Sequence, residues 1–298
     1  MHSTCESTLH PAVAVSVATA PALRLSSEPP SPDRPVAQKG DELMHPQAAG
    51  SVTQTYADDA FVARYAAVWA YGHADPARLS EPYYEQLINQ VTVALPAPPR
   101  HVLDVGCGPG RVIADLADQL AGARCTGIDA SPAMIALAES IIHTAEGSAV
   151  VLDPSDFGFA LTSIPTRGRP DVELLDESLA RYRQRERQHD VVVASHLLDR
   201  VPDPRATLED LTNLVIPGGR LVVTCAFNYS ERTQWALRSA EDIARHLTSL
   251  GFAIEHEDDG VEYVERLDIR GTLTHHRAAL VRARRRDGAG AEDVVTGR

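Results

Sequence analysis

The stretch VLDVGCGPGRV, residues 102–112, constrains the fold of this chain more than any other segment. It places Gly106, Gly108 and Gly110 directly after a short apolar run that contains Asp104. A glycine-rich turn between a strand and a helix lets the backbone approach a ligand closely and points the first helical N–H groups at it. The stretch therefore predicts a strand, a ligand-binding turn and a helix, in that order.

The spacing of these glycines limits the kind of ligand. Dinucleotide-binding turns carry G-x-G-x-x-G, whereas this chain has G-x-G-x-G followed by Arg111. A phosphate-binding loop ending in G-K-S/T is excluded, because Lys39 is the only lysine in the sequence. The turn is expected to approach a ligand without enclosing a pyrophosphate, and an NAD-dependent oxidoreductase is the weaker alternative.

Strands and helices alternate along the chain after residue 99, which predicts an α/β fold with a doubly wound, mostly parallel sheet. Ser131 has the chemistry of a helix N-cap, and Pro132 suits the first helical turn. Two consecutive strands near the end of the chain, 252–256 and 273–282, predict an antiparallel edge. The other strands are expected at 101–105, 124–128, 172–175, 191–194 and 220–226, and helices at 111–120, 204–214 and 240–250.

The rest of the chain divides into three segments. Residues 1–50 lack periodicity and are expected to be a disordered leader, and residues 287–298 a flexible tail. Residues 51–98 are expected to form a helical lid in front of the domain at 99–286. Phe61, Tyr65 and Trp69 recur every four residues and so share one face of a helix. That face either packs on a core or closes over a ligand.

Composition narrows the range of partners. The formal net charge of −13 argues against nucleic acid and against anionic membrane. The 4 cysteines are widely spaced and form no C-x-x-C pair, so no metal site and no disulfide framework is predicted. The apolar segment at 11–23 is too short to span a bilayer and follows no basic residue. A cytoplasmic protein is expected.

An acid at the end of the second strand completes the pattern. In an open α/β sheet the ligand lies outside the carboxyl ends of the central strands, where both the turn and Asp129 are expected. D-V-G-C-G-P-G followed by G-I-D-A-S-P-A-M resembles the class I S-adenosylmethionine-dependent methyltransferases over about residues 57–285. The resemblance implies a Rossmann-like, seven-stranded sheet and S-adenosylmethionine as the cofactor.

The resemblance also implies roles for individual residues. Asp129 would accept hydrogen bonds from the ribose hydroxyls, with Ala130 and Met134 beside the adenine. The methionine end of the cofactor would be held by Asp104, Gly106, Cys107, Gly108 and Gly110.

The family's third motif is an acid after the third strand that binds the adenine amino group. Two candidates compete, Asp153 in AVVLDPSDF and Asp176 in DVELLDESL. Asp176 is preferred, because its distance from Asp190 better suits the run into the fourth strand. Residues 148–170 then become an insertion, expected to be an extended or hairpin excursion.

The segment ASHLLDRVPDP, residues 194–204, resembles the family's stretch that faces the methyl donor. Ser195 and His196 would line the sulfonium, with His196 either a general base or a packing residue. Asp199, a second candidate catalytic residue, or Arg200, a candidate substrate-binding residue, would help to place the acceptor. Aromatic faces attract cations, so the remaining candidates for the acceptor pocket, each of which has packing as its alternative role, are Tyr65, Trp69, Tyr229 and Trp235.

A narrower resemblance concerns LLDRVPDP, the insertion before it, and TCAFNYSERTQW at 224–235. These segments are similar to the methyltransferase domain that acts on mercaptohistidine in ovothiol formation. We carry over only a small polar acceptor, amino-acid-like or from secondary metabolism, methylated on nitrogen or oxygen. The predicted function is a small-molecule methyltransferase that works as a monomer or homodimer. The non-enzymatic alternative is a module that binds S-adenosylmethionine without catalysis.

Overall fold

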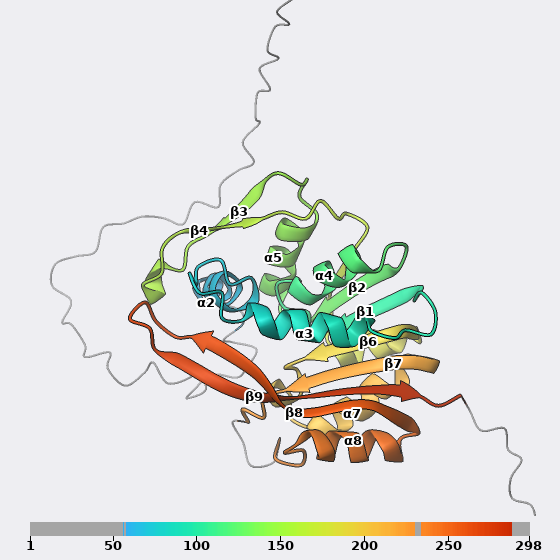
Figure 1. Cartoon of the computed structure of the whole chain (residues 1–298). Helices are drawn as coiled ribbons and strands as arrows, with labels where there is room; N and C mark the ends of the chain where they lie inside the picture. Colours follow the sequence, from blue (N-terminus) through green and yellow to red (C-terminus); the bar gives the residue numbers. More distant parts are fainter. Residues whose placement is uncertain (1–55, 57, 230–233, 288–298) are drawn as a thin grey trace, which may run out of the picture. The chain divides into compact units, whose positions relative to one another are not determined.

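The computed structural model describes residues 56, 58–229 and 234–287. Its main element is a seven-stranded sheet of order β5-β2-β1-β6-β7-β9-β8 (Figure 1). The first five strands in this order run parallel, whereas β9 is antiparallel to both β7 and β8. The strands are β1 (His101–Val105), β2 (Arg124–Asp129), β5 (Glu173–Asp176), β6 (His189–Ser195), β7 (Val215–Cys225), β8 (Phe252–Arg266) and β9 (Leu273–Arg285). The predicted mostly parallel sheet with an antiparallel edge is confirmed. The predicted leader at 1–50 and the predicted tail, apart from Asp287, lie outside the described residues.

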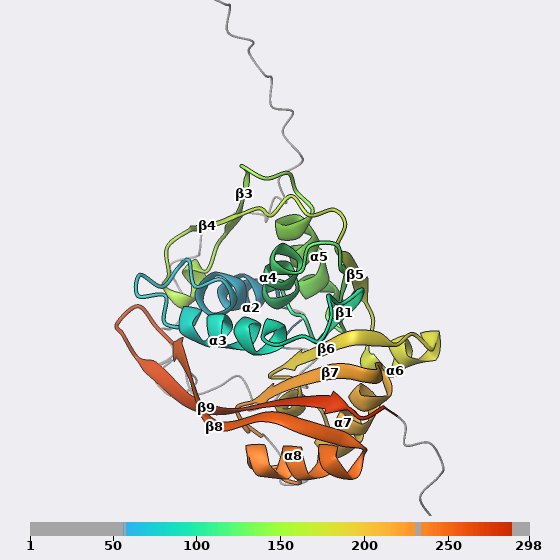
Figure 2. The same ribbon diagram turned by 45° about the vertical axis from the view of Figure 1, so that its right-hand side comes forward.

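Helices cover both faces of the sheet (Figure 2). Strand side chains alternate between two apolar clusters: Val191 and Val193 belong to the first, and Val192 and Ala194 to the second. The first cluster includes α3 (Glu81–Thr92), α4 (Arg111–Gln119) and α5 (Pro132–Ile142); the second includes α6 (Leu179–Tyr182), α7 (Pro204–Asn213) and α8 (Ala240–Ser249). Among the described residues, no helix combines the length and the hydropathy needed to cross a bilayer.

Local chemistry sets the helix that follows β2. The Ser131 hydroxyl accepts a hydrogen bond from the Met134 N–H at 3.2 Å, and Pro132 is the first helical residue. The predicted N-cap is therefore confirmed. Because the cap residue comes directly after Asp129 and Ala130, it fixes where α5 begins relative to the end of β2.

The N-terminal aromatic segment changes helix type partway. α2 (Asp59–Arg64) continues into the π-helix η1 (Tyr65–Ala70), whose Tyr71 N–H reaches back five residues to the Ala66 carbonyl at 2.9 Å. A π turn inserts one residue into the helical ladder and often occurs near functional sites. The spacing of the aromatic residues predicted only a regular helix, so this widened turn is a difference from the prediction.

The predicted insertion at 148–170 is a two-stranded antiparallel hairpin of β3 (Ala149–Leu152) and β4 (Thr162–Pro165). It forms a sheet separate from the main one. Leu152 and Ile164 from the hairpin share an apolar cluster with Phe61 and Trp69. The insertion therefore supports the N-terminal helices from the side opposite the main sheet's strands β7 to β9, as both views show (Figures 1 and 2).

The last two strands are longer than predicted and form an arm. β9 pairs with β7 only over residues 279–284, whereas residues 261–266 of β8 pair with residues 273–278 of β9 alone. The charged run EHEDDGVEYVER hides the alternation of apolar side chains, and the register shifts between Asp258 and Val261. The chain between the two predicted strands, expected to be irregular, is thus largely strand. This distal hairpin reaches toward α2 (Figure 1).

Candidate active site

The glycine turn lies at the carboxyl ends of β1 and β2, as predicted. Gly106, Gly108 and Gly110 have φ values of 74°, 54° and 83°, in the region that favours glycine. The N–H groups of Gly106 and Cys107 both donate to the Ile128 carbonyl, at 2.8 and 3.0 Å, which ties the turn to the end of β2.

The three glycines are required for different reasons. A Cβ on Gly106 would approach the Leu197 side chain at 3.1 Å, and one on Gly108 would meet only Tyr65, at 3.8 Å. A Cβ on Gly110 would collide with Ile142 of α5 at 2.5 Å. Gly106 and Gly108 line the cavity described next, whereas Gly110 does not. The bare backbone at Gly110 therefore serves helix packing, and the prediction that it holds the cofactor has no support in its position.

A cavity of about 420 Å³ opens beside the turn. Its walls come from the ends of β1 and β2, from the segments after β5 and β6, and from Tyr56 and Tyr65 in front of the sheet. A volume of this size is typical of small-molecule sites. Of the predicted site residues, those that line it are Tyr65, Gly106, Gly108, Asp129, Ala130, Met134 and Arg200.

Asp129 is held with its carboxylate at the cavity wall. One oxygen accepts the Gly108 N–H at 2.9 Å, and the other accepts the Ser131 N–H at 2.8 Å. Each oxygen has a second lone pair left to accept a hydroxyl donor. Burial raises the pKa of Asp129, and these two backbone hydrogen bonds oppose the increase. The carboxylate can therefore accept two hydroxyls presented from the cavity.

Asp104 lies at the base of the turn and is buried. Its Oδ2 atom has no hydrogen-bond partner among the described residues. Burial, followed by the nearby charge of Asp129, raises the pKa of Asp104 to about 7. Asp104, Cys107 and Ser195 line a small hollow next to the main cavity. A buried carboxylate without a partner is costly, and a cationic group in this hollow would relieve that cost.

Asp176, the preferred candidate for the family's third acid, lies at the end of β5, the strand predicted at 172–175. β5 pairs with β2, and Asp176 stands directly opposite Asp129 in the register. Asp153 follows β3 on the separate hairpin and is exposed. The Asp176 side chain is also exposed and does not line the cavity, whereas its neighbour Glu177 does. The Glu177 carboxylate is bound by Arg185 at 2.5 and 2.9 Å.

His196 follows β6 in a strained backbone conformation, with φ of 50°. Its ring stacks on Tyr83 at 5.0 Å and lies 4.8 Å from the ring of Tyr263. Burial lowers the pKa of His196 to about 3, so the imidazole is neutral, and its Nε2 atom has no hydrogen-bond partner in the described part of the chain. Ser195 beside it bonds the Tyr83 hydroxyl at 2.8 Å. A neutral imidazole can orient an acceptor by a hydrogen bond, and its role as a base stays a prediction.

Asp199 and Arg200 differ in position. Asp199 is 2% exposed and does not line the cavity, and burial raises its pKa. Arg200 does line it, with its Nε 3.8 Å from the Asp199 carboxylate. The pair therefore presents a cation at the cavity wall with its counter-charge behind it.

Three predicted acceptor residues lie outside the cavity lining. Trp69 is buried and donates its indole N–H to the Arg266 carbonyl at 3.0 Å. Trp235 is 56% exposed, and Tyr229 packs against the apolar cluster around α8. Of the predicted aromatic set, only Tyr65 lines the cavity. The spacing of aromatic residues in a helix or a loop does not determine which rings turn inward, so the sequence alone could not separate Tyr65 from the other three.

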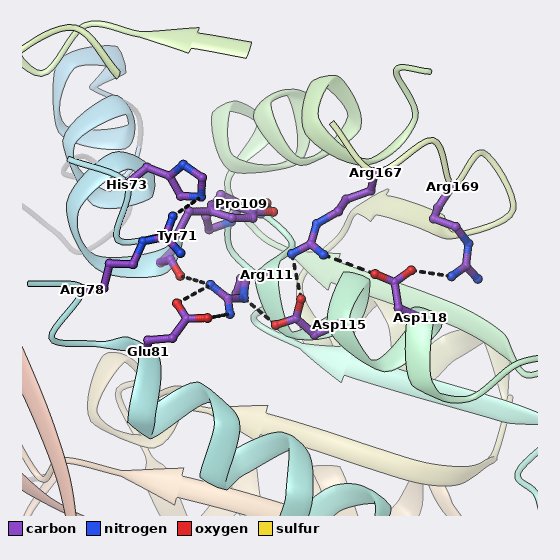
Figure 3. Close-up of polar contacts among 11 residues, drawn as sticks. Tyr71, His73, Arg78, Glu81, Pro109, Arg111, Asp115, Asp118, Arg167 and Arg169 are labelled. Carbon is purple, nitrogen blue, oxygen red and sulfur yellow. Dashed lines mark hydrogen bonds and ion pairs between the residues drawn. The ribbon is translucent and has the colours of Figure 1, made fainter. Parts of the chain in front are cut away.

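A chain of ion pairs extends from Arg111, which directly follows the turn (Figure 3). Arg111, the first residue of α4, bonds Glu81 of α3 at 2.8 Å, the Ala70 carbonyl at 3.4 Å, and Asp115. Asp115 in turn accepts from Arg167, which follows β4 within the insertion, at 2.7 Å. We call this set the back network; its outer members are Asp118, Arg169 and Asp171. It ties the turn to the N-terminal helices and to the insertion.

Sequence reasoning missed several residues near the site. Tyr56 lines the cavity, and its carbonyl accepts the Ser131 hydroxyl at 2.6 Å. Tyr83 and Tyr263 enclose His196. Nothing in the local sequence marks these tyrosines, because each reaches the site through contacts between distant segments. Groups of three or more His, Cys, Asp or Glu placed to hold a metal ion do not occur in the described part of the chain.

Comparison with known proteins defines the class. The model of a methyltransferase domain family matches residues 78–257, and the chain belongs to this family. Its fold and its glycine turn are those of the class I S-adenosylmethionine-dependent methyltransferases.

Curated relatives are trans-aconitate 2-methyltransferases. The one from Streptomyces avermitilis is 28% identical over 164 residues, which cover 55% of this chain and 53% of the relative. The one from Escherichia coli O139:H28 is 30% identical over 139 residues, covering 47% of this chain and 44% of the relative. The chain thus spans about half the length of the curated relatives it matches.

Two solved structures show the same fold. Magnesium protoporphyrin IX methyltransferase from Synechocystis PCC 6803, solved with bound SAM, has a TM-score of 0.52 at 18% identity, over 80% of this chain and 98% of that one. An O-methyltransferase family protein from Burkholderia thailandensis has a TM-score of 0.53 at 19% identity, over 83% of this chain and 67% of that one.

Proposed function

We propose that this protein transfers a methyl group from S-adenosylmethionine to a small-molecule acceptor. The observation that carries the proposal is the pair of acids on either side of the glycine turn. Asp104 has a buried oxygen without a partner among the residues that the structure describes, and Asp129 lies at the cavity wall. These groups fit the two polar ends of the cofactor. When bound, S-adenosylmethionine supplies an electrophilic methyl group on a sulfonium cation.

Each protein group has a defined task in this proposal. Asp104 binds the ammonium of the methionine part, and Asp129 accepts the two ribose hydroxyls. Ala130 and Met134 lie beside the adenine, where both line the cavity. The N-terminal segment 51–98 acts as a lid, because Tyr56 and Tyr65 form the wall in front of the turn. Holding the acceptor in line with the methyl group supplies much of the rate acceleration, because alignment alone is worth several kcal/mol, roughly 7 or more.

The acceptor is proposed to be amino-acid-like or a secondary metabolite, methylated on nitrogen or oxygen. Trans-aconitate, named for the relatives, is a polycarboxylate. The lining of this cavity offers Arg200 as its one cation among the described residues, against the acids Asp129, Glu177 and Asp210. That balance disfavours a polyanion. The catalytic roles of His196 and Asp199 stay predictions, as do the cytoplasmic location and the monomeric or dimeric state.

Calorimetry tests the cofactor. We expect the protein to bind S-adenosylmethionine and not NAD, and the reverse result would favour an oxidoreductase. Asp129→Ala should weaken S-adenosylmethionine binding by about 1.5–3 kcal/mol, the scale of hydrogen bonds to a charged group. Asp153→Ala, which changes an exposed acid on the separate hairpin, is the matched control and should bind as the wild type does. Equal affinities of the two variants would show that the ribose site is misplaced.

Turnover separates an enzyme from a binding module. The protein is incubated with methyl-labelled S-adenosylmethionine and a panel of amino acids, dipeptides and imidazoles. Transfer of label to any acceptor supports the proposed activity. Tight cofactor binding with no transfer to any member would favour a non-catalytic role.

A further inference from the structure

Arg200 differs from the other arginines that reach the interior. Its guanidinium has no hydrogen-bond partner among the described residues, and its nearest acid there, Asp199, lies 3.8 Å from Nε, which is beyond hydrogen-bond distance. The guanidiniums of Arg64, Arg111 and Arg220 each donate hydrogen bonds, the shortest of which join well-placed oxygens at 2.9, 2.8 and 2.7 Å. The Arg200 side chain is 31% exposed and lines the main cavity. Its donors are therefore available to a ligand.

A short turn after β6 brings Arg200 to the cavity. This 3₁₀ turn, η4 (Leu198–Arg200), follows Leu197, the residue that a Cβ on Gly106 would approach at 3.1 Å. The Arg200 N–H donates to the Leu197 carbonyl at 2.9 Å, and the Asp199 side chain is fully buried. The backbone and the buried counter-charge thus hold Arg200 beside the glycine turn without using its terminal nitrogens.

Two tyrosines of the N-terminal segment line the same cavity as Arg200. The rings of Tyr56 and Tyr65 meet edge to face, with centroids 6.0 Å apart. Neither phenol hydroxyl has a hydrogen-bond partner in the part of the chain that the structure describes. Burial raises the pKa of both phenols, and the nearby charge of Arg200 opposes the increase. A guanidinium and two hydroxyls, all of which can donate, therefore line one cavity.

The charges of the cavity wall leave Arg200 for a ligand. Two acids of the lining, Glu177 and Asp210, are already paired with Arg185 and Arg183. Arg200 is therefore not needed to neutralise them. A carboxylate suits the donors at this wall, because it only accepts hydrogen bonds and matches the two parallel N–H groups of a guanidinium. One such cation fits one carboxylate.

The carboxylate of S-adenosylmethionine belongs to a different part of the site. It is attached to the same carbon atom as the ammonium assigned to Asp104, so the two groups lie side by side. The hollow that Asp104 lines also includes Cys107 and Ser195, and Arg200 does not line it. Arg200 is therefore left for a group that arrives with the methyl acceptor.

We propose that Arg200 is a specificity-determining residue that binds a carboxylate of the methyl acceptor, with the hydroxyls of Tyr56 and Tyr65 as further donors. This inference rests on the proposed function and narrows the acceptor to a monocarboxylic acid such as an amino acid. An oxygen whose charge is neutralised by a guanidinium is a poor nucleophile. The bound carboxylate therefore orients the acceptor, and the methyl group goes to another nitrogen or oxygen of the same molecule.

The test measures binding to protein saturated with S-adenosylhomocysteine, so that no methyl transfer occurs. The probes are three pairs of a carboxylate and its amide: L-histidine and L-histidinamide, L-tyrosine and L-tyrosinamide, and benzoate and benzamide. We expect at least one carboxylate to bind and its amide to bind at least tenfold more weakly. Arg200→Met should weaken binding of that carboxylate about tenfold or more. Arg205→Met is the matched control and should not, because Arg205 is exposed and does not line the cavity.

A second pair of ligands distinguishes the acceptor from the cofactor as the source of the carboxylate. S-adenosylhomocysteine carries a carboxylate, whereas 5′-methylthioadenosine has none. We expect Arg200→Met to bind both compounds as the wild type does. If the variant binds S-adenosylhomocysteine more weakly but 5′-methylthioadenosine normally, Arg200 holds the cofactor and the inference is overturned.

The remaining outcomes separate this inference from the proposed function. If the wild type fails to bind S-adenosylhomocysteine, the proposed function itself fails. If it binds that compound but no carboxylate probe, or binds carboxylates and amides equally, only the carboxylate inference is overturned. The same holds if Arg200→Met and Arg205→Met affect the probes alike. Chemical unfolding verifies that each variant is folded. Arg200→Lys, which keeps a positive charge beside Asp199, is the second variant; an unchanged preference for carboxylate over amide in it would contradict recognition by paired N–H groups.

Discussion

The two sides of the glycine turn use the same residue types in opposite ways. On the cavity side, the Asp104 carboxylate retains an oxygen without a partner, and Asp129 retains lone pairs that face the cavity. On the other side, the back network pairs Arg111 with Glu81 and Asp115 at short distances. Asp104 and Asp129 keep accepting atoms free toward the proposed ligand, whereas Glu81 and Asp115 are paired with Arg111 and hold the turn in place.

The glycines divide in the same manner. The missing side chain of Gly108 leaves space at the cavity, and the missing side chain of Gly110 leaves space for α5. Substitutions on the cavity side should therefore reduce cofactor affinity with little loss of stability. Substitutions at Gly110 or in the back network should reduce the free energy of unfolding more than they reduce cofactor affinity.

Gly110→Ala should have the largest effect. The new Cβ would meet Ile142 at 2.5 Å, in a backbone conformation with φ of 83°. Overpacking and the left-handed backbone together should lower the free energy of unfolding by about 2–5 kcal/mol, measured by urea unfolding. Gly122→Ala is the control, because it has φ of 89° but no atom within 4 Å of its Cβ, and it should cost only roughly 1–2 kcal/mol. Equal losses would show that packing against α5 is unimportant.

Asp104→Asn should have the second-largest effect, and the quantity that changes is the affinity for S-adenosylmethionine. Loss of a charged hydrogen bond to the cofactor ammonium should weaken S-adenosylmethionine binding by about 1.5–3 kcal/mol in calorimetry. The variant should not be less stable than the wild type at neutral pH, since it removes a buried carboxyl group whose Oδ2 atom has no partner among the described residues. If Asp104→Asn unfolds more readily than the wild type yet binds S-adenosylmethionine normally, Asp104 stabilises the fold and does not bind the cofactor.

The pH dependence of stability in Asp104→Asn and in the wild type tests whether the pKa of Asp104 is raised in the folded protein. The pKa of Asp104 is about 7 in the folded protein and lies above its unfolded value of 3.8. The folded state therefore binds the proton more tightly, so the stability from this group is present below about pH 4 and is lost as the pH rises toward 7. Between pH 5 and 8, unfolding free energies of the cofactor-free wild type should fall relative to Asp104→Asn. A constant difference between the two proteins would contradict the raised pKa.

Arg111→Met should lower the free energy of unfolding by about 1–3 kcal/mol, between the values for exposed and buried ion pairs. The arginine side chain is 11% exposed, and its loss leaves Glu81 and Asp115 without this partner. Cofactor affinity, measured at a temperature where the variant is folded, should change less than it does in Asp104→Asn. A larger loss of affinity than of stability would show that the back network sets the geometry of the turn.

The sequence was sufficient for features that depend on neighbouring residues. Local patterns of this kind are the strand, turn and helix around Gly106, the N-cap at Ser131 and the acid at Asp129. The alternation of strands and helices was enough to predict the parallel core of the sheet. The same information could not separate Gly108 from Gly110, because the collision with Ile142 depends on how α5 packs on α4. It also could not place the distal hairpin, since the hairpin meets the helix of Tyr65 through contacts such as Trp69 with Arg266, 197 residues apart.

Arg169→Ala should have the smallest effect on the free energy of unfolding. It tests whether the outer members of the back network contribute to stability. Arg169 pairs with Asp118 and Asp171, whose side chains are 44% and 60% exposed, so solvent screens both interactions. We expect a loss of no more than about 1 kcal/mol in urea unfolding, which disappears in high salt. Arg167→Ala is the matched comparison, because Arg167 also binds Asp115, which is only 16% exposed. Its loss should be larger and less sensitive to salt, since Asp115 would then depend on Arg111 alone; equal losses from the two arginines would mean that the network stabilises the protein through its surface charges and not through its contact with the turn.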